Sequence, residues 1–520
     1  MNRLRILVVA SAALLALAAC SSSSGGSAAS GAGASAGSVA AAPAGSPQPG
    51  GTLKVARAES FDGWNPDSAA AYASYQTLNA VLEPMVRVSA DGTGLEPGIA
   101  SKWTYDPKAK TWTFTLRDGV TFSDGTPLTS ADVAFSAGEW AKGKNFGYAY
   151  ANIKKVTTPD PQTVVFELAA PDTTWPVLMS WTSSAVYPKD FGGKTAEDFY
   201  KAPVGAGAFT VADWTPGGKI DLKKSPHYYL PGRPYLDGVE IDVVADANEQ
   251  SLQFESGQTD IVEYVSAVNA PKYADAIVAL PESQVEHLSL NVKKPALADP
   301  SVRKAIALGI DYAAIAKGAF PGHGTPAKGI IAPNLPNWAP PTGAPVTRDV
   351  AAAKAELAKA ATQPGTLELI YDSGIPADGL VAQVVQSNLK DVGIDVKLTG
   401  LETGAFLDRA FGLDADMMVW SYGAISPDVF DPMGWILGTS MLFTGADDAK
   451  LAQQLTDYRA AETPEAKQKI VTQVQDDAAA DGSAIPLANF QVLHAAGKNV
   501  NGFSSAPWGL YYWDPIWLAR

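Results

Sequence analysis

The chain has 520 residues, of which 46% are hydrophobic and 18% are charged. This composition is typical of a folded protein with room for more than one domain. It carries 54 acidic and 39 basic residues, a formal charge of -15, and this acidity argues against nucleic acid and anionic lipid headgroups as partners. Cys20 is the one cysteine, which excludes an internal disulfide and the usual cysteine-based zinc and iron–sulfur sites.

The first twenty residues are typical of an export signal. Arg3 and Arg5 precede a short apolar run that ends with Leu-Ala-Ala directly before Cys20. A basic start, a short apolar stretch and small residues at the end describe a secretory signal. The position of Cys20 resembles a lipobox, in which this cysteine becomes the lipidated first residue of the mature protein. The alternative is an ordinary signal peptide with an incidental cysteine.

Residues 21–50 consist almost entirely of serine, glycine, alanine and proline. Such a segment cannot bury enough apolar surface to offset the entropy lost on ordering. We therefore expect residues 1–20 to be a signal peptide, residues 21–50 to be a disordered tether, and the folded body to begin at residue 51.

The first half of the folded body is dominated by alternating apolar and polar residues, which predict strands. The predicted strands are 52–56, 112–116, 163–168, 220–222 and 239–243. A helix is expected to begin at Ser130 as its cap, with Asp132 placed well for the helix dipole.

From about residue 290 the pattern changes to alternating helices and strands, which indicates an open α/β lobe. Asp299 and Pro300 open a helix, the helix 380–389 ends near Gly393, and strands are predicted at 367–371, 394–398 and 417–420.

Signatures of catalysis and metal binding do not stand out. The chain has no Gly-x-Ser-x-Gly elbow, and the phosphate-loop-like stretch 138–144 is followed by Asn145 where serine or threonine is required. Acidic residues are abundant, so two carboxylates could meet in a cleft, and the sequence alone does not exclude a glycosidase. We expect no enzyme, no metal site and no cofactor, and we expect the histidines to be surface or hydrogen-bonded side chains. The four histidines are His227, His287, His323 and His494.

A longer series of segments carries a family resemblance. Residues 112–136 read WTFTLRDGVTFSDGTPLTSADVAFS, and related segments follow in the same order at 203–209, 235–241, 254–260, 290–311 and 392–396. This series resembles the family 5 extracellular solute-binding proteins, the peptide, nickel and opine class of ABC-importer receptors. It spans nearly the whole body from residue 51 onward.

The resemblance implies an α/β, periplasmic-binding-protein-like fold of the cluster C type, with two main lobes, a hinge of two crossings and a smaller inserted domain. The implied domain segments are 51–84, 205–290 and 485–520 for the base domain I, 85–204 for the inserted domain II, and 291–484 for domain III. The ligand would lie between the lobes, which close over it.

The function implied by the resemblance is that of a substrate-binding lipoprotein without catalysis. A monomer, lipid-anchored at the outer face of the membrane in the periplasm or at the cell surface, would capture a peptide or related small solute. It would deliver the solute to an ABC permease and its ATPase subunits. Two alternatives stay open: a tethered extracellular hydrolase of glycans or peptides, and a sensory or adhesion lipoprotein on the same fold.

The most informative stretch for the ligand is 417–435, because the resemblance places the end of its strand at the cleft. Peptide receptors of the family commonly carry an acid three residues after a tryptophan there. In this chain Trp420 is followed by Ser421, Tyr422 and Gly423, and the next acid is Asp428. This departure favours a ligand without a free peptide amino terminus, unless an acid elsewhere does the same work.

From the same stretch we expect Trp420 and Tyr422 to line the ligand, with Ser421, Gly423 and Asp428 beside it. The change Trp420→Ala should then lower ligand affinity without unfolding the protein, which titration calorimetry would measure.

Further aromatic residues lie where the resemblance places cleft loops. Trp64 and Tyr72 follow the first strand, and Trp181 lies at the return of the insertion to the base. More aromatics crowd the C-terminus at 508–513. Flat aromatic faces suit peptide, sugar or chelate ligands, and they are equally common in a hydrophobic core.

Overall fold

The computed structural model describes residues 45–61, 63–68, 72–343 and 346–519. The predicted signal, Cys20 and most of the tether lie outside the described residues. Within the described part of the chain, no helix combines the length and the apolar character needed to cross a membrane.

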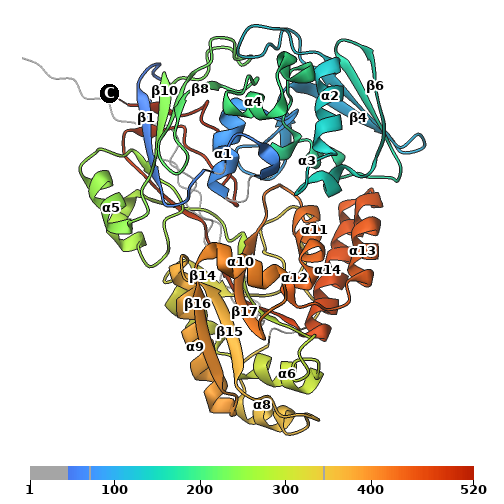
Figure 1. Ribbon diagram of the computed structural model, residues 1–520, viewed down its shortest axis with the longest axis vertical. Helices are drawn as coiled ribbons and strands as arrows, with labels where there is room; N and C mark the ends of the chain where they lie inside the picture. Colours follow the sequence, from blue (N-terminus) through green and yellow to red (C-terminus); the bar gives the residue numbers. More distant parts are fainter. Residues whose placement is uncertain (1–44, 62, 69–71, 344–345, 520) are drawn as a thin grey trace, which may run out of the picture. The chain divides into compact units, whose positions relative to one another are not determined.

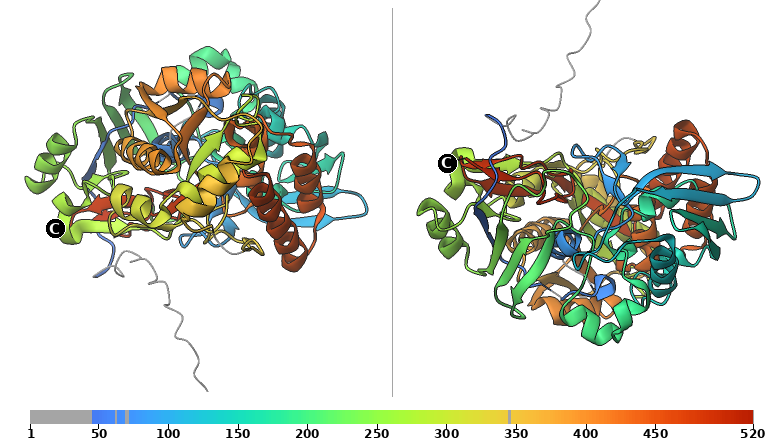
Figure 2. Two further views of the ribbon diagram at one scale, coloured as in Figure 1. Left: turned by 90° about the horizontal axis from the view of Figure 1, so that it is seen from below. Right: turned by 90° about the horizontal axis from the view of Figure 1, so that it is seen from above.

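The first predicted strand becomes β1 (Thr52–Arg57), which lies inside a seven-stranded sheet (Figure 1). Leu53 and Val55 of β1 pair in parallel with Val239 and Ile241 of β10, and all four side chains are buried. The strand order is β12 (Ile277–Ala279), β19 (Leu493–Ala496), β11 (Ile261–Val262), β1, β10 (Gly238–Val243), β9 (Ile220–Lys224) and β8 (Phe209–Trp214). Strand β19, close to the C-terminus (red in Figures 1 and 2), thus shares a sheet with the first strand, β1 (blue).

The alternating residues 112–116 lie in β5 of a four-stranded antiparallel sheet. Trp112, Phe114 and Leu116 point to the same buried face, where Phe166 of β7 lies opposite Trp112. The order is β4 (Ala100–Asp106), β5 (Thr111–Leu116), β7 (Thr163–Leu168) and β6 (Ile153–Asp160).

The helix α2 (Ser130–Trp140) packs against β6 and β7. Its cap is Thr129 and not the predicted Ser130, because the Asp132 carboxylate accepts hydrogen bonds from both the backbone N–H and the hydroxyl of Thr129.

The α/β pattern after residue 290 builds a six-stranded sheet with its own core. Helix α6 (Pro300–Gly309) is capped by Asp299, whose carboxylate accepts the Ser301 N–H at 2.8 Å. Helix α9 (Pro376–Val392) ends at Gly393, which adopts the left-handed conformation at φ 100° that glycine tolerates best. The strand order is β14 (Gly324–Pro326), β18 (Ala484–Phe490), β13 (Gln284–Leu290), β17 (Met417–Gly423), β15 (Leu367–Asp372) and β16 (Val396–Leu401).

The remaining helices and short strands complete these parts. The helices are α1 (Tyr72–Val81), α3 (Trp175–Leu178), α4 (Ala196–Lys201), α5 (Ala247–Glu255), α7 (Tyr312–Ala319), α8 (Val350–Leu357), α10 (Thr403–Phe411), α11 (Phe430–Gly438), α12 (Ser440–Phe443), α13 (Ala449–Ala460) and α14 (Pro464–Asp481). The short strands are β2 (Val86–Val88), β3 (Leu95–Pro97), β20 (Val500–Asn501) and β21 (Trp517–Leu518).

Two crossings of the chain connect the seven-stranded and six-stranded sheets, at 280–283 and 491–492. They lie side by side, because the Leu280 N–H donates to the Val492 carbonyl at 2.9 Å. Strands β13 and β18 both pair within the six-stranded sheet. This membership favours domain limits near the crossings over the expected 290 and 485, and the seven-segment division stays a prediction.

Candidate ligand-binding site

A pocket of about 410 Å³, partly open to solvent, lies where the three sheet-bearing parts of the fold meet. Its lining residues are Tyr75, Phe146, Ser180, Trp181, Thr182, Ser183, Tyr264, Ile425, Trp508 and Leu510. Tyr75 of α1, Tyr264 after β11, and Trp508 and Leu510 after β19 belong to the part that holds the seven-stranded sheet, which we call the base. Phe146 and residues 180–183 belong to the part that holds the four-stranded sheet, which we call the insertion. Ile425 follows β17 in the part that holds the six-stranded sheet, which we call the second lobe.

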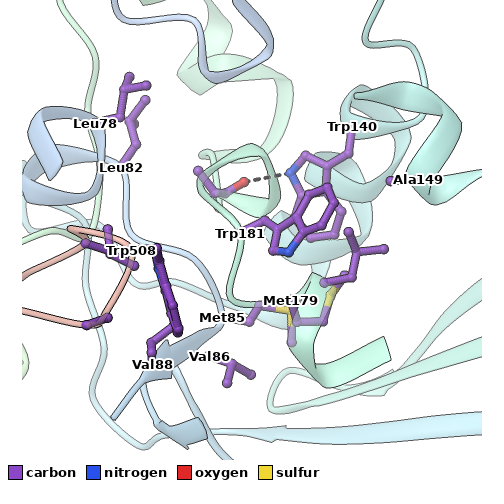
Figure 3. Close-up of a cluster of buried hydrophobic side chains, with 14 of the residues drawn as sticks. Leu78, Leu82, Met85, Val86, Val88, Trp140, Ala149, Met179, Trp181 and Trp508 are labelled. Carbon is purple, nitrogen blue, oxygen red and sulfur yellow. Dashed lines mark hydrogen bonds between the residues drawn. The ribbon is translucent and has the colours of Figure 1, made fainter. Parts of the chain in front are cut away.

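The aromatic walls of this pocket continue the main hydrophobic core. Figure 3 shows Trp508 on one side and Trp181 with Trp140 on the other, with Met85 and Met179 labelled nearby. Trp181 and Trp508 are 4% and 1% exposed, so only parts of their rings remain accessible to a solute. Because these rings are fixed by core packing, the pocket is largely preformed.

Tyr264 is held by polar contacts with His494 and Gln76. Its N–H donates to Nδ1 of His494 at 3.3 Å, and its hydroxyl accepts from the Gln76 amide at 2.6 Å. Burial lowers the pKa of His494 to about 3, so the ring is neutral and can accept. The Gln76 amide also donates to the Gly509 carbonyl at 2.9 Å. At Gly509, φ is 95° and a Cβ would meet the Tyr264 ring at 3.1 Å, so the loop after Trp508 requires glycine.

The insertion contributes a wall of hydroxyl groups after α3. The Tyr150 hydroxyl lies 2.8 Å from Oγ of both Ser183 and Ser184. The Ser180 hydroxyl donates to the Val177 carbonyl at 2.7 Å, which turns the chain out of α3. These hydroxyls give the pocket polar atoms without adding charge.

A buried ion pair lies directly behind Tyr264. The Arg57 guanidinium and the Glu263 carboxylate are 3.3 Å apart, and both side chains are 1% exposed or less. Tyr511 donates its hydroxyl to the same carboxylate. Burial raises the pKa of Glu263, while Arg57 and Tyr511 oppose the shift. Each charge therefore has its partner inside the protein.

The insertion and the second lobe also touch directly, beside the pocket. Arg459, in the last turn of α13, donates to the Asp172 carboxylate at 2.9 Å, and its carbonyl accepts the Thr173 N–H at 2.7 Å. The Trp181 and Phe430 rings lie 5.8 Å apart. These contacts can stabilise a closed arrangement of the lobes.

The residues predicted on β17 lie in the second lobe, outside the pocket lining. Trp420 stacks on Phe406 at 5.4 Å and meets Phe443 edge-on at 5.3 Å. Tyr422 stacks on Trp435 at 5.5 Å. All are partly or fully buried within that lobe. Their contact with a solute stays a prediction.

The other predicted residues of this stretch serve the interior of the same lobe. Ser421 lies opposite Glu286 in the strand register, and Gly423 packs against Gln284. Asp428 is 4% exposed and accepts hydrogen bonds from three groups. Its donors are the Phe430 N–H at 2.8 Å, the Tyr458 hydroxyl at 2.6 Å and the Asn337 amide at 3.1 Å.

Of the remaining predicted residues, only Trp181 lines the pocket. Trp64 is 1% exposed and packs edge-on against Phe61 and Trp214. The side chain of Tyr72 lies outside the described residues. Sequence reasoning missed Tyr75, Phe146, Tyr264, Ile425 and Leu510, and no motif marks them; Trp508 was noted only as part of the C-terminal aromatic cluster.

The structure gives no sign of a metal centre in the part of the chain that it describes, where no group of three or more histidine, cysteine or acidic side chains could hold a metal ion. Two histidines instead make hydrogen bonds: Nε2 of the buried His287 lies 3.1 Å from the Ile330 carbonyl, and Nδ1 of the half-buried His323 lies 3.0 Å from the Gln491 side-chain oxygen.

Comparison with known proteins places this architecture in a family. A model of the bacterial extracellular solute-binding proteins, family 5 middle region, matches residues 94–441. The probable D,D-dipeptide-binding periplasmic protein of Escherichia coli K12 is 30% identical over 383 residues, which cover 71% of this chain and 72% of that protein. A glutathione-binding protein of E. coli is 26% identical over 433 residues, covering 79% and 83%.

Solved structures agree on the fold. The binding protein AgaA of A. tumefaciens R10 in complex with agropinic acid has a TM-score of 0.79 and 28% identity, covering 90% of this chain and 99% of that one. The peptide complex of DppA from Helicobacter pylori has a TM-score of 0.80 at 21% identity, covering 91% and 99%, and shows the fold alone. The predicted periplasmic-binding-protein fold is thereby confirmed.

The family model and the two relatives confirm a periplasmic or extracellular binding protein and not an enzyme. The chain belongs to the family 5 bacterial extracellular solute-binding proteins, the substrate receptors of ABC importers.

Proposed function

We propose that this receptor captures a small, peptide-like or related solute in the pocket around Trp181 and Trp508, and that it delivers the solute to an ABC permease. The observation that carries this proposal is the composition of the pocket wall, to which the base, the insertion and the second lobe all contribute. A solute that contacts all three favours the closed arrangement, which a permease can distinguish from the open one.

The lipid anchor is the second part of the proposal. Acylation of Cys20 holds the protein at the outer face of the membrane, and the tether 21–50 lets the body reach the permease. The support comes from the sequence, since the one cysteine directly follows Leu-Ala-Ala after an apolar run.

A deletion strain tests both parts. Its uptake of candidate solutes, such as radiolabelled dipeptides and disaccharides, is compared with strains complemented by the wild type and by Cys20→Ser. We expect deletion to abolish uptake of at least one solute, wild type to restore it, and Cys20→Ser to release a binding-competent protein into the medium or periplasm. Unchanged uptake on deletion would refute the transport role, and membrane retention of the Cys20→Ser protein would refute the anchor.

A further inference from the structure

The pocket wall carries no charge. Its ten lining residues are aromatic, aliphatic or hydroxyl-bearing, and the lining contains no Asp, Glu, Lys, Arg or His. Burial raises the pKa of the Tyr264 phenol well above its ordinary value, so this lining group is also neutral. A charged group placed here would lose its hydration without gaining a counter-charge from the wall.

Two carboxylates next to the wall are already committed to protein partners. Arg57 pairs with Glu263 behind Tyr264, as described above. Asp67, which holds the loop before Phe146, accepts three backbone N–H groups, including that of Phe146 at 3.0 Å. Neither carboxylate can turn to a solute ammonium without leaving its present partners unpaired.

On the side of the second lobe, the acid that is hydrogen-bonded to the lining residue Ile425 is also occupied. Asp431 accepts the Ile425 N–H at 2.5 Å and the Tyr422 hydroxyl at 3.1 Å. Burial raises its pKa to about 7, which further weakens its ability to hold a cation at neutral pH.

The wall does offer unused hydrogen-bond donors. The indole N–H groups of Trp181 and Trp508 are buried and have no acceptor among the described residues. Trp140, in the same cluster, donates its N–H to the Ala185 carbonyl at 2.8 Å (Figure 3), whereas five tryptophans outside the pocket lining share the unpaired state: Trp64, Trp175, Trp214, Trp420 and Trp435. An indole N–H only donates, so a partner at these two positions must supply acceptor atoms.

We infer that the pocket takes an uncharged part of a solute, with a flat or apolar face for the aromatic rings and acceptor oxygens for the Trp181 and Trp508 indoles. This inference rests on the proposed function and names the chemistry of its ligand. Two sources share that chemistry, a peptide with blocked or remote termini and a neutral pyranose sugar. In both, carbonyl, ether or hydroxyl oxygens meet the N–H groups while apolar faces stack on the rings.

Matched probe pairs test the charge requirement by titration calorimetry with the detergent-solubilised full chain. N-acetyl-leucyl-leucinamide is compared with the free dipeptide leucyl-leucine, and cellobiose is compared with cellobionic acid. We expect the neutral member of at least one pair to bind at least tenfold more tightly than its charged partner. The pair that binds identifies the source. A charged member that binds as tightly as its neutral partner, or the absence of binding by both neutral probes at millimolar concentration, would overturn the inference.

Two variants test the donors. Trp181→Phe and Trp508→Phe keep an aromatic face and remove the N–H, and each should weaken binding of the neutral probe about fivefold. Trp214→Phe is the matched control, because Trp214 also buries an unpaired N–H but lies outside the pocket lining. Equal affinities for all three variants, with each shown to be folded by its thermal transition, would count against the inference.

Uptake separates this inference from the proposed function. Tight binding of a charged probe, with its uptake lost on deletion, refutes the ligand chemistry and keeps the receptor role. Binding of a neutral probe, with uptake of that probe unaffected by deletion, refutes the receptor role and supports the ligand chemistry.

Discussion

Glu286 makes the stability of the second lobe depend on pH. This side chain lies on β13, is 1% exposed, and neither carboxylate oxygen has a hydrogen-bond partner among the described residues. Burial raises its pKa from 4.5 to about 8. Asp378, at the start of α9, has its pKa raised by its own burial and by the charge of Glu286. In the folded protein, a proton therefore remains on this pair at pH values where the unfolded chain is ionised.

The sign and size of the effect follow from linkage. Because the folded carboxyl binds its proton more tightly than the unfolded one, Glu286 contributes stability that is fully present below pH 4.5. This contribution is lost as the pH rises through about 8. A shift of this size corresponds to at most roughly 5 kcal/mol. Glu286→Gln replaces the protonated carboxyl by a neutral group of nearly equal shape and removes this dependence.

Urea denaturation between pH 5 and pH 8.5 measures the difference. We expect Glu286→Gln to match wild type within about 1 kcal/mol at pH 5 and to exceed it by several kcal/mol at pH 8.5. The exposed Glu255, at the end of α5, supplies the control Glu255→Gln, which should follow the wild-type curve. Parallel pH profiles for wild type and Glu286→Gln would refute the reasoning.

Three further changes test the packing around the site. Arg459→Gln removes the ion pair between insertion and second lobe and should weaken solute binding about tenfold by calorimetry, whereas Arg348→Gln, at an exposed ion pair, should not. Glu263→Gln leaves the Arg57 charge buried without its counterion and should lower the unfolding free energy by about 3 kcal/mol; an unchanged urea midpoint would contradict this. Trp420→Ala should lower solute affinity and also cost about 3 kcal/mol of stability, since its ring is stacked within the lobe, and an unaltered thermal transition would argue against that packing role.

Local sequence patterns predicted the elements whose stability is decided locally. The alternation of residues 112–116 corresponds to β5 because one face of that strand is buried and the other is not. Gly393 ends α9 as expected, because its left-handed conformation is costly for other residues. The cap of α2 was placed one residue late, since Ser130 and Thr129 have equivalent hydroxyls and only the reach of Asp132 distinguishes them.

The residues that line the pocket could not be predicted from local sequence patterns. Tyr75, Phe146, Tyr264 and Ile425 come from segments far apart in the chain, and each meets the others only through tertiary contacts. Trp181 was predicted because the resemblance gave its position relative to the insertion. Asp428 was predicted to lie beside the ligand because it is the next acid after Trp420. A buried hydrogen-bond network also requires such an acid, and the structure shows Asp428 in a network of this kind.

The hinge and the pocket share one physical connection. Ser283, which is fully buried on the crossing between β12 and β13, donates its hydroxyl to the Pro507 carbonyl at 2.6 Å. Trp508 is the next residue and forms part of the pocket wall. A rotation of the second lobe about the crossings therefore acts on the Ser283–Pro507 hydrogen bond and, through it, on the position of the Trp508 ring. The affinity for a solute that touches Trp508 then includes the free energy of lobe closure, and the protein can couple solute capture to the closed shape that a permease recognises.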